Sequence, residues 1–198
     1  MSGVTPTRAA VLELQEEQRA MHEGHLFLDE KCLLLAGEML RQLGRHAELQ
    51  RHFDTMQRDA VSALQAALAR HGLQGLQVQP SAVQDGTRLR CEARSLMGVP
   101  LQDAAWQGGT RPAPPAVHAS PEARDCRRAF ERLLAAAAPL AAVRGNLERL
   151  SQEYRRSLRR ARALQDVLMP ELAREIDDIQ TRLEELEQED ALTMRRQH

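Results

Sequence analysis

Three side chains that could bind a metal ion share one face of a predicted helix near the start of the chain. His25 and Asp29 follow His22 by three and seven residues, a spacing that places all three on one side of an α-helix. The surrounding segment MHEGHLFLDE lacks the HExxH arrangement, and no cysteine or histidine cluster lies near it in the sequence. We therefore predict no metal site. His25 belongs instead to an apolar seam described below, with the other two side chains beside it.

The sequence also lacks the usual signatures of catalysis and of cofactor binding. Neither a GxxxxGK[ST] nor a GxGxxG segment is present to hold a phosphate. No serine, cysteine or threonine stands at a suggestive spacing from a base, and a two-helix coil offers no pocket for a substrate. The sequence thus predicts no catalytic residue, no cofactor and no enzymatic activity of the chain's own.

A basic belt and an acidic belt follow each other in the C-terminal part of the chain. The basic residues, within YRRSLRRAR, are Arg155, Arg156, Arg159, Arg160 and Arg162. The acidic residues are Glu171, Glu175, Asp177, Asp178 and those of EELEQED at 184–190. A nucleic-acid site would need more basic faces and stacking aromatic side chains, so we predict no nucleic-acid partner. The belts fit either a solvated helix face or docking to a patterned protein surface.

The composition favours long helices over an ordinary globular core. Only 3% of the 198 residues are aromatic, whereas 42% are hydrophobic and 28% charged, a balance that suits helices with a narrow apolar seam. Three cysteines without a CxxC pair are typical of a reducing cytoplasm. The first residues do not resemble a signal peptide, and the longest apolar run, 133–143, is too short to span a bilayer. We therefore expect no membrane insertion.

The N-terminal part of the chain carries an apolar heptad seam. Steps of three and four residues keep one phase for about seven heptads, which predicts a coiled coil over 7–71. A helix of that length would extend about 90–100 Å at 1.5 Å per residue. The seam positions are Val11, Leu14, Gln18, Met21, His25, Leu28, Cys32, Leu35, Met39, Gln42, His46, Leu49, Phe53, Met56, Ala60 and Ala63.

A second seam in the C-terminal part changes phase at a proline. It runs through Leu147, Leu150, Tyr154, Ser157, Ala161, Leu164 and Leu168, then through Leu172, Ile176, Ile179, Leu183 and Leu186. The spacings alternate between three and four except from Leu164 to Ile176, where three steps of four follow one another. One extra residue has entered the seam, and Pro170 lies at that slip. We predict a kink or local unwinding there, with the helix continuing to about Met194.

The two seams predict a mainly α-helical fold, a long antiparallel two-helix coiled coil with a small insertion. The insertion, 72–120, holds most of the prolines and glycines, and the C-terminal helical region, 121–196, starts with a Ser120–Pro121 cap. Within the insertion, residues 87–102 partly alternate between apolar and charged side chains, as a strand does. With LQVQP (76–80) before them and an Asp-Gly pair at 85–86, we predict a short β-hairpin, and a loop in GGTRPAPPAVHA.

Three segments together resemble the D subunit of the V-type and A-type rotary ATPases. The opening PTRAAVLELQEEQRAMHEGHLFLDEKCLLL (6–35) is similar to the start of that family. The segment RRARALQDVLMPELAREIDDIQTRLEELEQED (159–190) is similar to its C-terminal signature, and SLMGVPL (95–101) to its middle hairpin. Their order and spacing match across essentially the whole chain.

The resemblance implies a central rotor stalk of a V/A-type ATPase or ATP synthase. Such a stalk transmits torque between the ion-translocating membrane rotor and the catalytic hexamer, and so couples ion transport to ATP synthesis or hydrolysis. It implies a non-catalytic component in the cytoplasm, peripheral to the membrane. Its partners would be the catalytic and regulatory subunits of the hexamer, the small F subunit and the connector to the membrane rotor. Candidate contacts with the ring cavity are Arg8, Arg159, Arg160, Pro170, Leu172, Ile176 and Glu184. A stand-alone coiled-coil adaptor or chaperone-like scaffold is the alternative interpretation.

Overall fold

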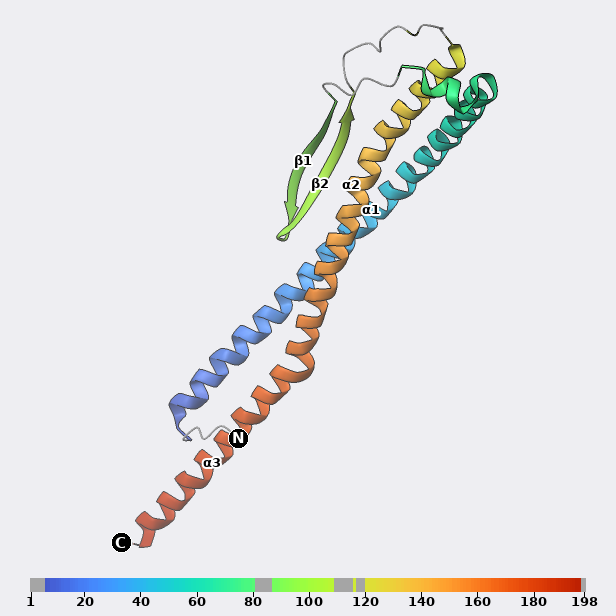
Figure 1. Ribbon diagram of the computed structural model, residues 1–198. Coiled ribbons are helices and arrows are strands. Elements are labelled where there is room, and N and C mark those ends of the chain that lie inside the picture. The colour runs from blue at the N-terminus through green and yellow to red at the C-terminus, as the bar shows by residue number, and fades with distance from the viewer. Residues whose placement is uncertain (1–5, 81–86, 109–115, 117–119, 197–198) are drawn as a thin grey trace. The chain divides into compact units, whose positions relative to one another are not determined.

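The computed structural model describes residues 6–80, 87–108, 116 and 120–196, and the chain is mainly helical (Figure 1). Helix α1 is Arg8–Gln77, α2 is Pro121–Ala163 and α3 is Met169–Arg196, with a five-residue π-helical turn at Leu164–Leu168 between α2 and α3. Strands β1, Arg88–Leu96, and β2, Val99–Gln107, form a hairpin. The chain divides into two compact units, Met1–Leu34 with Tyr154–His198, and Leu35–Glu153.

Side chains at the expected positions cap the helices. The Thr7 hydroxyl accepts a hydrogen bond of 3.1 Å from the Ala10 N–H in the first turn of α1. The Ser120 hydroxyl does the same for the Ala123 N–H at 3.2 Å, and Pro121 is the first residue of α2. The predicted Ser120–Pro121 start is therefore confirmed: serine satisfies an N–H that the helix itself cannot, and proline has no N–H to leave unpaired.

In the first unit, the start of α1 packs antiparallel against α3, as the blue and red-orange helices show (Figure 1). The core consists of Val11, Leu172, Ile176 and Ile179, with Leu14, Met21 and Leu183 packed against it. All sixteen seam positions predicted for α1 are buried or half-buried across the two units, which confirms the heptad phase. Leu168 and Leu186 were predicted in the seam, but 42% and 46% of their surface is exposed.

In the second unit, small side chains line the buried sides of the helices. Alanine occupies buried positions on α1 and on α2, and Val143 and Leu150 are fully buried. Near its end, α1 is interrupted at Gly72, whose φ of 65° and ψ of 174° are non-helical. A positive φ of this size suits glycine because it has no Cβ to clash with the backbone. The buried alanines are Ala60, Ala67, Ala129 and Ala136.

The hairpin exists, but its position in the sequence differs from the prediction. Strand β1 pairs antiparallel with β2, from Arg88 opposite Gln107 to Leu96 opposite Val99. The turn is Met97–Gly98, with φ values of 49° and 82°, while Leu76 and Gln77 of the expected first strand end α1. The Asp-Gly pair at 85–86, and most of the expected loop, lie outside the described residues. Two positive φ angles match the right-handed twist of a two-residue hairpin, so methionine here occupies a conformation that sequence rules reserve for asparagine or glycine.

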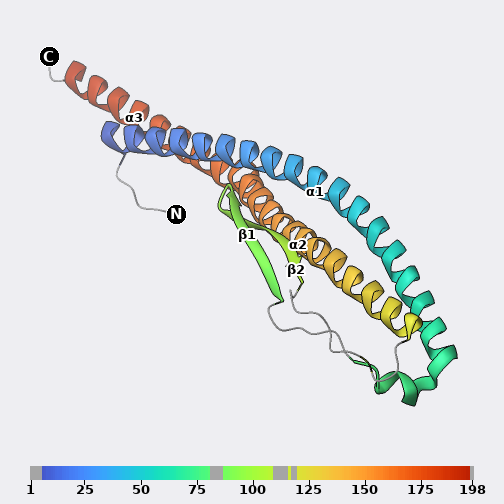
Figure 2. The same ribbon diagram turned by 90° about the horizontal axis from the view of Figure 1, so that it is seen from above.

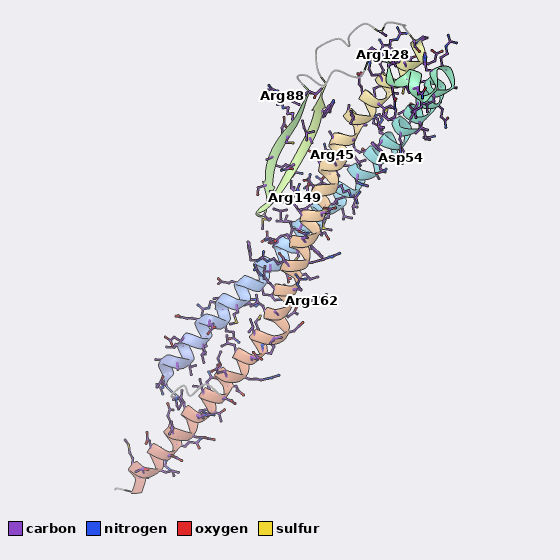
Figure 3. All side chains as sticks on the ribbon, in the orientation of Figure 1. Arg45, Asp54, Arg88, Arg128, Arg149 and Arg162 are labelled. Atoms are coloured by element: carbon purple, nitrogen blue, oxygen red, sulfur yellow. The ribbon has the colours of Figure 1, made fainter. Side chains whose placement is uncertain are left out.

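Side chains of α2 hold the hairpin by its backbone, and β2 lies next to that helix (Figure 2). The Asn146 amide donates to the Gln102 carbonyl at 2.7 Å and accepts from the Gln102 N–H at 2.8 Å. Arg149, labelled in Figure 3 beside the hairpin, donates to the Pro100 carbonyl at 2.8 Å. Because the backbone groups of Gln102 point toward Asn146, they face away from β1. Asn146 is 1% exposed, so this edge of β2 is closed by a buried amide.

A buried carboxylate on α1 holds the other strand. Glu38, 2% exposed, accepts hydrogen bonds from Arg94 of β1 at 2.6 Å and from Gln42 at 2.8 Å, and is ion-paired with Arg41. Burial raises the pKa of the Glu38 carboxyl, but these donors and charges outweigh it and leave the pKa below its ordinary value. Arg45 of α1 also meets Asp103 of β2 at 2.5 Å. The hairpin is thus fixed by directional polar contacts to both helices of its unit.

Replacing Asn146 with alanine removes the partner of both Gln102 backbone groups. We expect the free energy of unfolding to fall by about 2 kcal/mol, because two partly buried polar groups lose their hydrogen bonds. Chemical denaturation gives this value, and amide hydrogen exchange should show lost protection at Gln102. The control is Gln152→Ala, an exposed change on the same helix. An Asn146→Ala variant whose Gln102 amide stays protected would show that another contact holds the strand.

Candidate functional site: a helical shaft with a pi-helical turn

The described helices contain a π-helical turn immediately before Pro170. At Leu164–Leu168 the hydrogen bonding widens, and the Met169 N–H donates to the Leu164 carbonyl five residues back. Proline has no N–H, so in a regular α-helix Pro170 would leave the carbonyl of Asp166 without its hydrogen bond, and the proline ring would clash with that carbonyl. The wider turn holds one extra residue and relieves that clash. The predicted local unwinding at the seam slip is therefore confirmed, and its form is a π turn.

The π turn also sets the rotation of α3. Each residue advances an α-helix by about 100°, so if the same residues formed a regular α-helix without the π turn, Leu172 and Ile176 would point about 100° away from their present direction. With it, they are 6% and 8% exposed and pack against Val11. The turn itself contributes no buried side chain, which explains why Leu168 is exposed although the spacing placed it in the seam. The π turn leaves Leu168 outside the seam, and it keeps the later seam positions Leu172, Ile176 and Ile179 in phase with α1.

Gly24 of α1 faces this turn. A Cβ added at Gly24 would meet Leu164 Cδ1 at 3.9 Å, an ordinary van der Waals distance. An alanine would therefore fit, and the close approach of the two helices does not require glycine here. A surface hollow nearby is lined by Gln15, Gln18, Arg19, His22 and Met169.

The potential metal ligands do not form one cluster. His22 lines the hollow beside the turn, whereas His25 lies in the seam with its Nδ1 3.3 Å from Asp29 Oδ2. Within the described residues, no group of three histidine, cysteine, aspartate or glutamate side chains could hold a metal ion. The three residues therefore share a helical face, as their spacing predicts, without converging on one point.

The predicted contact residues fall into two groups. Arg8, Arg159, Arg160 and Glu184 are exposed, and Arg8 forms a surface ion pair of 2.6 Å with Glu187. Such an exposed pair adds little to stability. By contrast, Leu172 and Ile176 lie in the helix–helix core, where they hold α3 against α1. Pro170 is half-buried beside the π turn and acts through the backbone.

Nearly all side chains of the two charged belts are exposed to solvent. All five arginines of the basic belt are exposed on α2, and Figure 3 labels Arg162 among them. The acidic side chains of 184–190 are exposed on α3. The outer surface of this unit therefore changes from basic to acidic along its length while its core stays apolar. Among the described helices, none is both long and apolar enough to cross a membrane.

The unit that contains α3 is thus an antiparallel helix pair with an apolar core and a π turn, and the other unit holds a hairpin by polar contacts to its helices. The sequence of the chain matches the family described as the D subunit of ATP synthase over residues 10–197. The chain belongs to this family.

Its relatives include D subunits of both the V-type and the A-type ATP synthases. It is 24% identical to the V-type protein of Thermotoga neapolitana, over 98% of this chain and 96% of that protein. It is 26% identical to the A-type protein of Methanopyrus kandleri, over 99% of this chain and 86% of the relative. It is 29% identical to the V-type protein of Anaeromyxobacter dehalogenans, over 99% of this chain and 96% of that protein. The match therefore covers 98–99% of this chain and 86–96% of these relatives, as the resemblance of the three segments indicated.

A deletion and a substitution at the π turn should compensate for each other. Deleting Asp166 removes the extra residue but leaves Pro170 inside a regular helix, which we expect to cost about 3 kcal/mol of unfolding free energy. Pro170→Ala should restore most of that loss in the deletion background and change little in the full-length chain. Chemical denaturation of the four proteins measures this coupling.

Deleting Gln180, in the middle of α3, is the control. It leaves the π turn intact but rotates Leu183 out of the seam, so Pro170→Ala should not rescue it. If deletion of Asp166 is equally harmful with and without Pro170, the turn does not serve to accommodate the proline.

Proposed function

We propose that this chain is the central rotor shaft of a V/A-type ATPase or ATP synthase. The observation that carries the proposal is the family match over 10–197 in a chain whose two ends pair as one apolar-seamed helical shaft. The shaft transmits torque between a membrane rotor that moves ions and a ring that makes or hydrolyses ATP. The names of the relatives do not favour a stand-alone adaptor.

In this proposal the chain has no catalytic role of its own. Catalytic and regulatory subunits surround the unit that contains α3, while the small F subunit and a connector to the membrane rotor bind the chain elsewhere. The complex places the chain in the cytoplasm, peripheral to the membrane. ATP chemistry stays in the ring, and this chain binds no cofactor.

The proposed mechanism requires a stiff shaft with an uneven surface. Paired helices resist twisting because rotation of one against the other would expose the side chains buried between them. A surface that is basic at Arg159 and Arg160 and acidic at Glu184 presents different faces to otherwise equivalent ring sites. Electrostatic contacts of this kind affect orientation and register more than overall affinity. Leu172 and Ile176 contribute indirectly, by keeping α3 in its phase.

Reversing charge in the basic belt tests this role. In a complex reconstituted from this chain and its ring, rotor and membrane subunits, Arg159→Glu with Arg160→Glu should lower coupled ion transport by about tenfold, a loss of about 1.4 kcal/mol. Binding to the ring should change less, because the apolar seam is untouched. ATP-driven ion transport and ring affinity are measured side by side, with Arg132→Glu, an exposed change on α2, as the control.

Two negative results have different meanings. A wild-type chain that forms a homodimer and does not bind the ring would contradict the rotor role and favour an adaptor. A chain that binds, with normal coupling in the double variant, would show only that these arginines do not contact the ring.

A further inference from the structure

The end of α1 and the start of α2 are connected through one serine hydroxyl. His71 Nε2 lies 2.5 Å from Ser120 Oγ, although the two residues are 49 positions apart in the sequence. Both are half-buried and belong to the unit of Leu35–Glu153. In both ribbon views the end of α1 lies beside the start of α2 (Figure 1 and Figure 2). The segment between His71 and Ser120 thus leaves the helices and returns to them at one point.

His71 is the last residue of the regular part of α1. Gly72 follows it with non-helical backbone angles, φ 65° and ψ 174°. The chain then turns back on itself, since a Cβ added at Gly75 would lie 3.2 Å from the Cβ of His71. A side chain at position 75 would crowd an atom that is fixed to the backbone, so this close approach favours glycine. The last regular turn of α1 is therefore held by this turn on one side and by Ser120 on the other.

The partners of Ser120 determine where each proton lies. A serine hydroxyl has one proton and two lone pairs. The oxygen lies 3.1 Å from Glu122 Oε2 and accepts from the Ala123 N–H at 3.2 Å. The pKa of the Glu122 carboxyl lies below its ordinary value, because its own backbone N–H and then the Ser120 hydroxyl donate to it. An ionised carboxylate only accepts, so the serine proton points to Glu122, and His71 must donate its Nε2–H to the remaining lone pair.

This arrangement differs from a catalytic serine–histidine pair. In such a pair the serine donates to the histidine Nε2, and a carboxylate binds the other ring nitrogen. Here the Glu122 carboxylate accepts the serine proton, and His71 is the donor. The contact therefore does not activate Ser120 as a nucleophile, and its effect is to connect two helices.

We propose that His71, Ser120 and Glu122 form a latch, through which the end of α1 and the first turn of α2 open and close together. Ser120 caps α2, so a change that pulls its oxygen toward or away from His71 also changes the cap. Arg127 donates to the Pro80 carbonyl at 3.4 Å, a longer contact between the same two parts of the chain. The latch concerns how the segment that carries the hairpin is held, and it goes beyond the proposed rotor role.

Hydrogen exchange in the full chain measures this coupling. His71→Ala leaves the Ser120 cap in place, yet the Ala123 and Arg124 amides, which bond to Ser120, should exchange about fivefold faster, the effect of one lost hydrogen bond. His71→Gln keeps an N–H donor and should stay close to the wild-type rates. His52→Ala, an exposed change on α1 in the same unit, is the control and should leave both rates unchanged.

Ser120→Ala tests the coupling in the other direction. It removes the cap, so the first turn of α2 should exchange faster with or without a latch. The latch predicts in addition that the amides of 68–71, at the end of the regular part of α1, exchange faster. If either His71→Ala or Ser120→Ala leaves the opposite helix unchanged, Ser120 is only a local cap and the proposal is wrong.

The position of the histidine proton is an independent readout. Long-range proton–nitrogen NMR, at a pH where histidine is neutral, should find the His71 ring protonated on Nε2. Glu122→Ala leaves the serine proton without its acceptor, so the form protonated on Nδ1 should gain population. Glu122→Gln keeps an acceptor oxygen and should retain the wild-type form. A wild-type ring protonated on Nδ1 would overturn the proposal, because Ser120 would then donate to His71.

Discussion

The burial of one narrow apolar stripe between two helices is the constraint on which the rest of this structure depends. The apolar stripe on each helix is only about one side chain wide. The stripes of the two paired helices must therefore face each other along their whole contact. An error of a single residue rotates every later side chain by about 100° and exposes the core. Ser157 and Ala161 are buried before the break at Leu164–Leu168, and Leu172 and Ile176 are buried after it, so the phase is kept on both sides.

The π turn and the proline are two parts of one solution. A proline in a regular helix clashes with the carbonyl four residues earlier, and an inserted residue in a regular seam shifts its phase. Placed together, the insertion gives the proline room, and the proline disfavours return to the regular helix. Pro170 follows the turn directly, and the burial of Leu172 and Ile176 requires the register that the turn gives. A shaft built this way can change its winding at one defined level without losing its core.

Polar contacts play the corresponding role for the hairpin. Val99 and Leu101 are buried, but two apolar side chains do not determine the orientation of a two-stranded sheet. The Asn146 amide and the Glu38 carboxylate do, since each needs its partners at defined angles in a buried setting. The apolar core thus stabilises the paired helices, whereas the buried polar groups determine the orientation of the hairpin.

The sequence predicts the helices well because their signal is long and repeated. The seam phase of α1, the capping by Ser120 and the unwinding beside Pro170 follow from spacing and from residue types that permit few alternatives. The exposure of Leu168 could not be predicted, because a spacing pattern does not show which residue a π turn pushes outward. The prediction put the hairpin turn in the wrong place because Met97 adopts a positive φ, a conformation that is uncommon for methionine. The roles of Glu38 and Asn146 depend on contacts between distant segments, which periodicity does not encode.

Rotation of this chain inside its ring is the most direct test of the rotor role. Cys91 is exposed on β1, whereas Cys32 and Cys126 are buried, so a thiol-reactive probe can be attached at one position of the native chain. With the ring fixed to a surface and supplied with ATP, a gold particle on Cys91 should rotate in one direction, with pauses that lengthen as ATP is lowered. A particle that stays still while the ring hydrolyses ATP at its full rate would contradict the role of this chain as the rotor shaft.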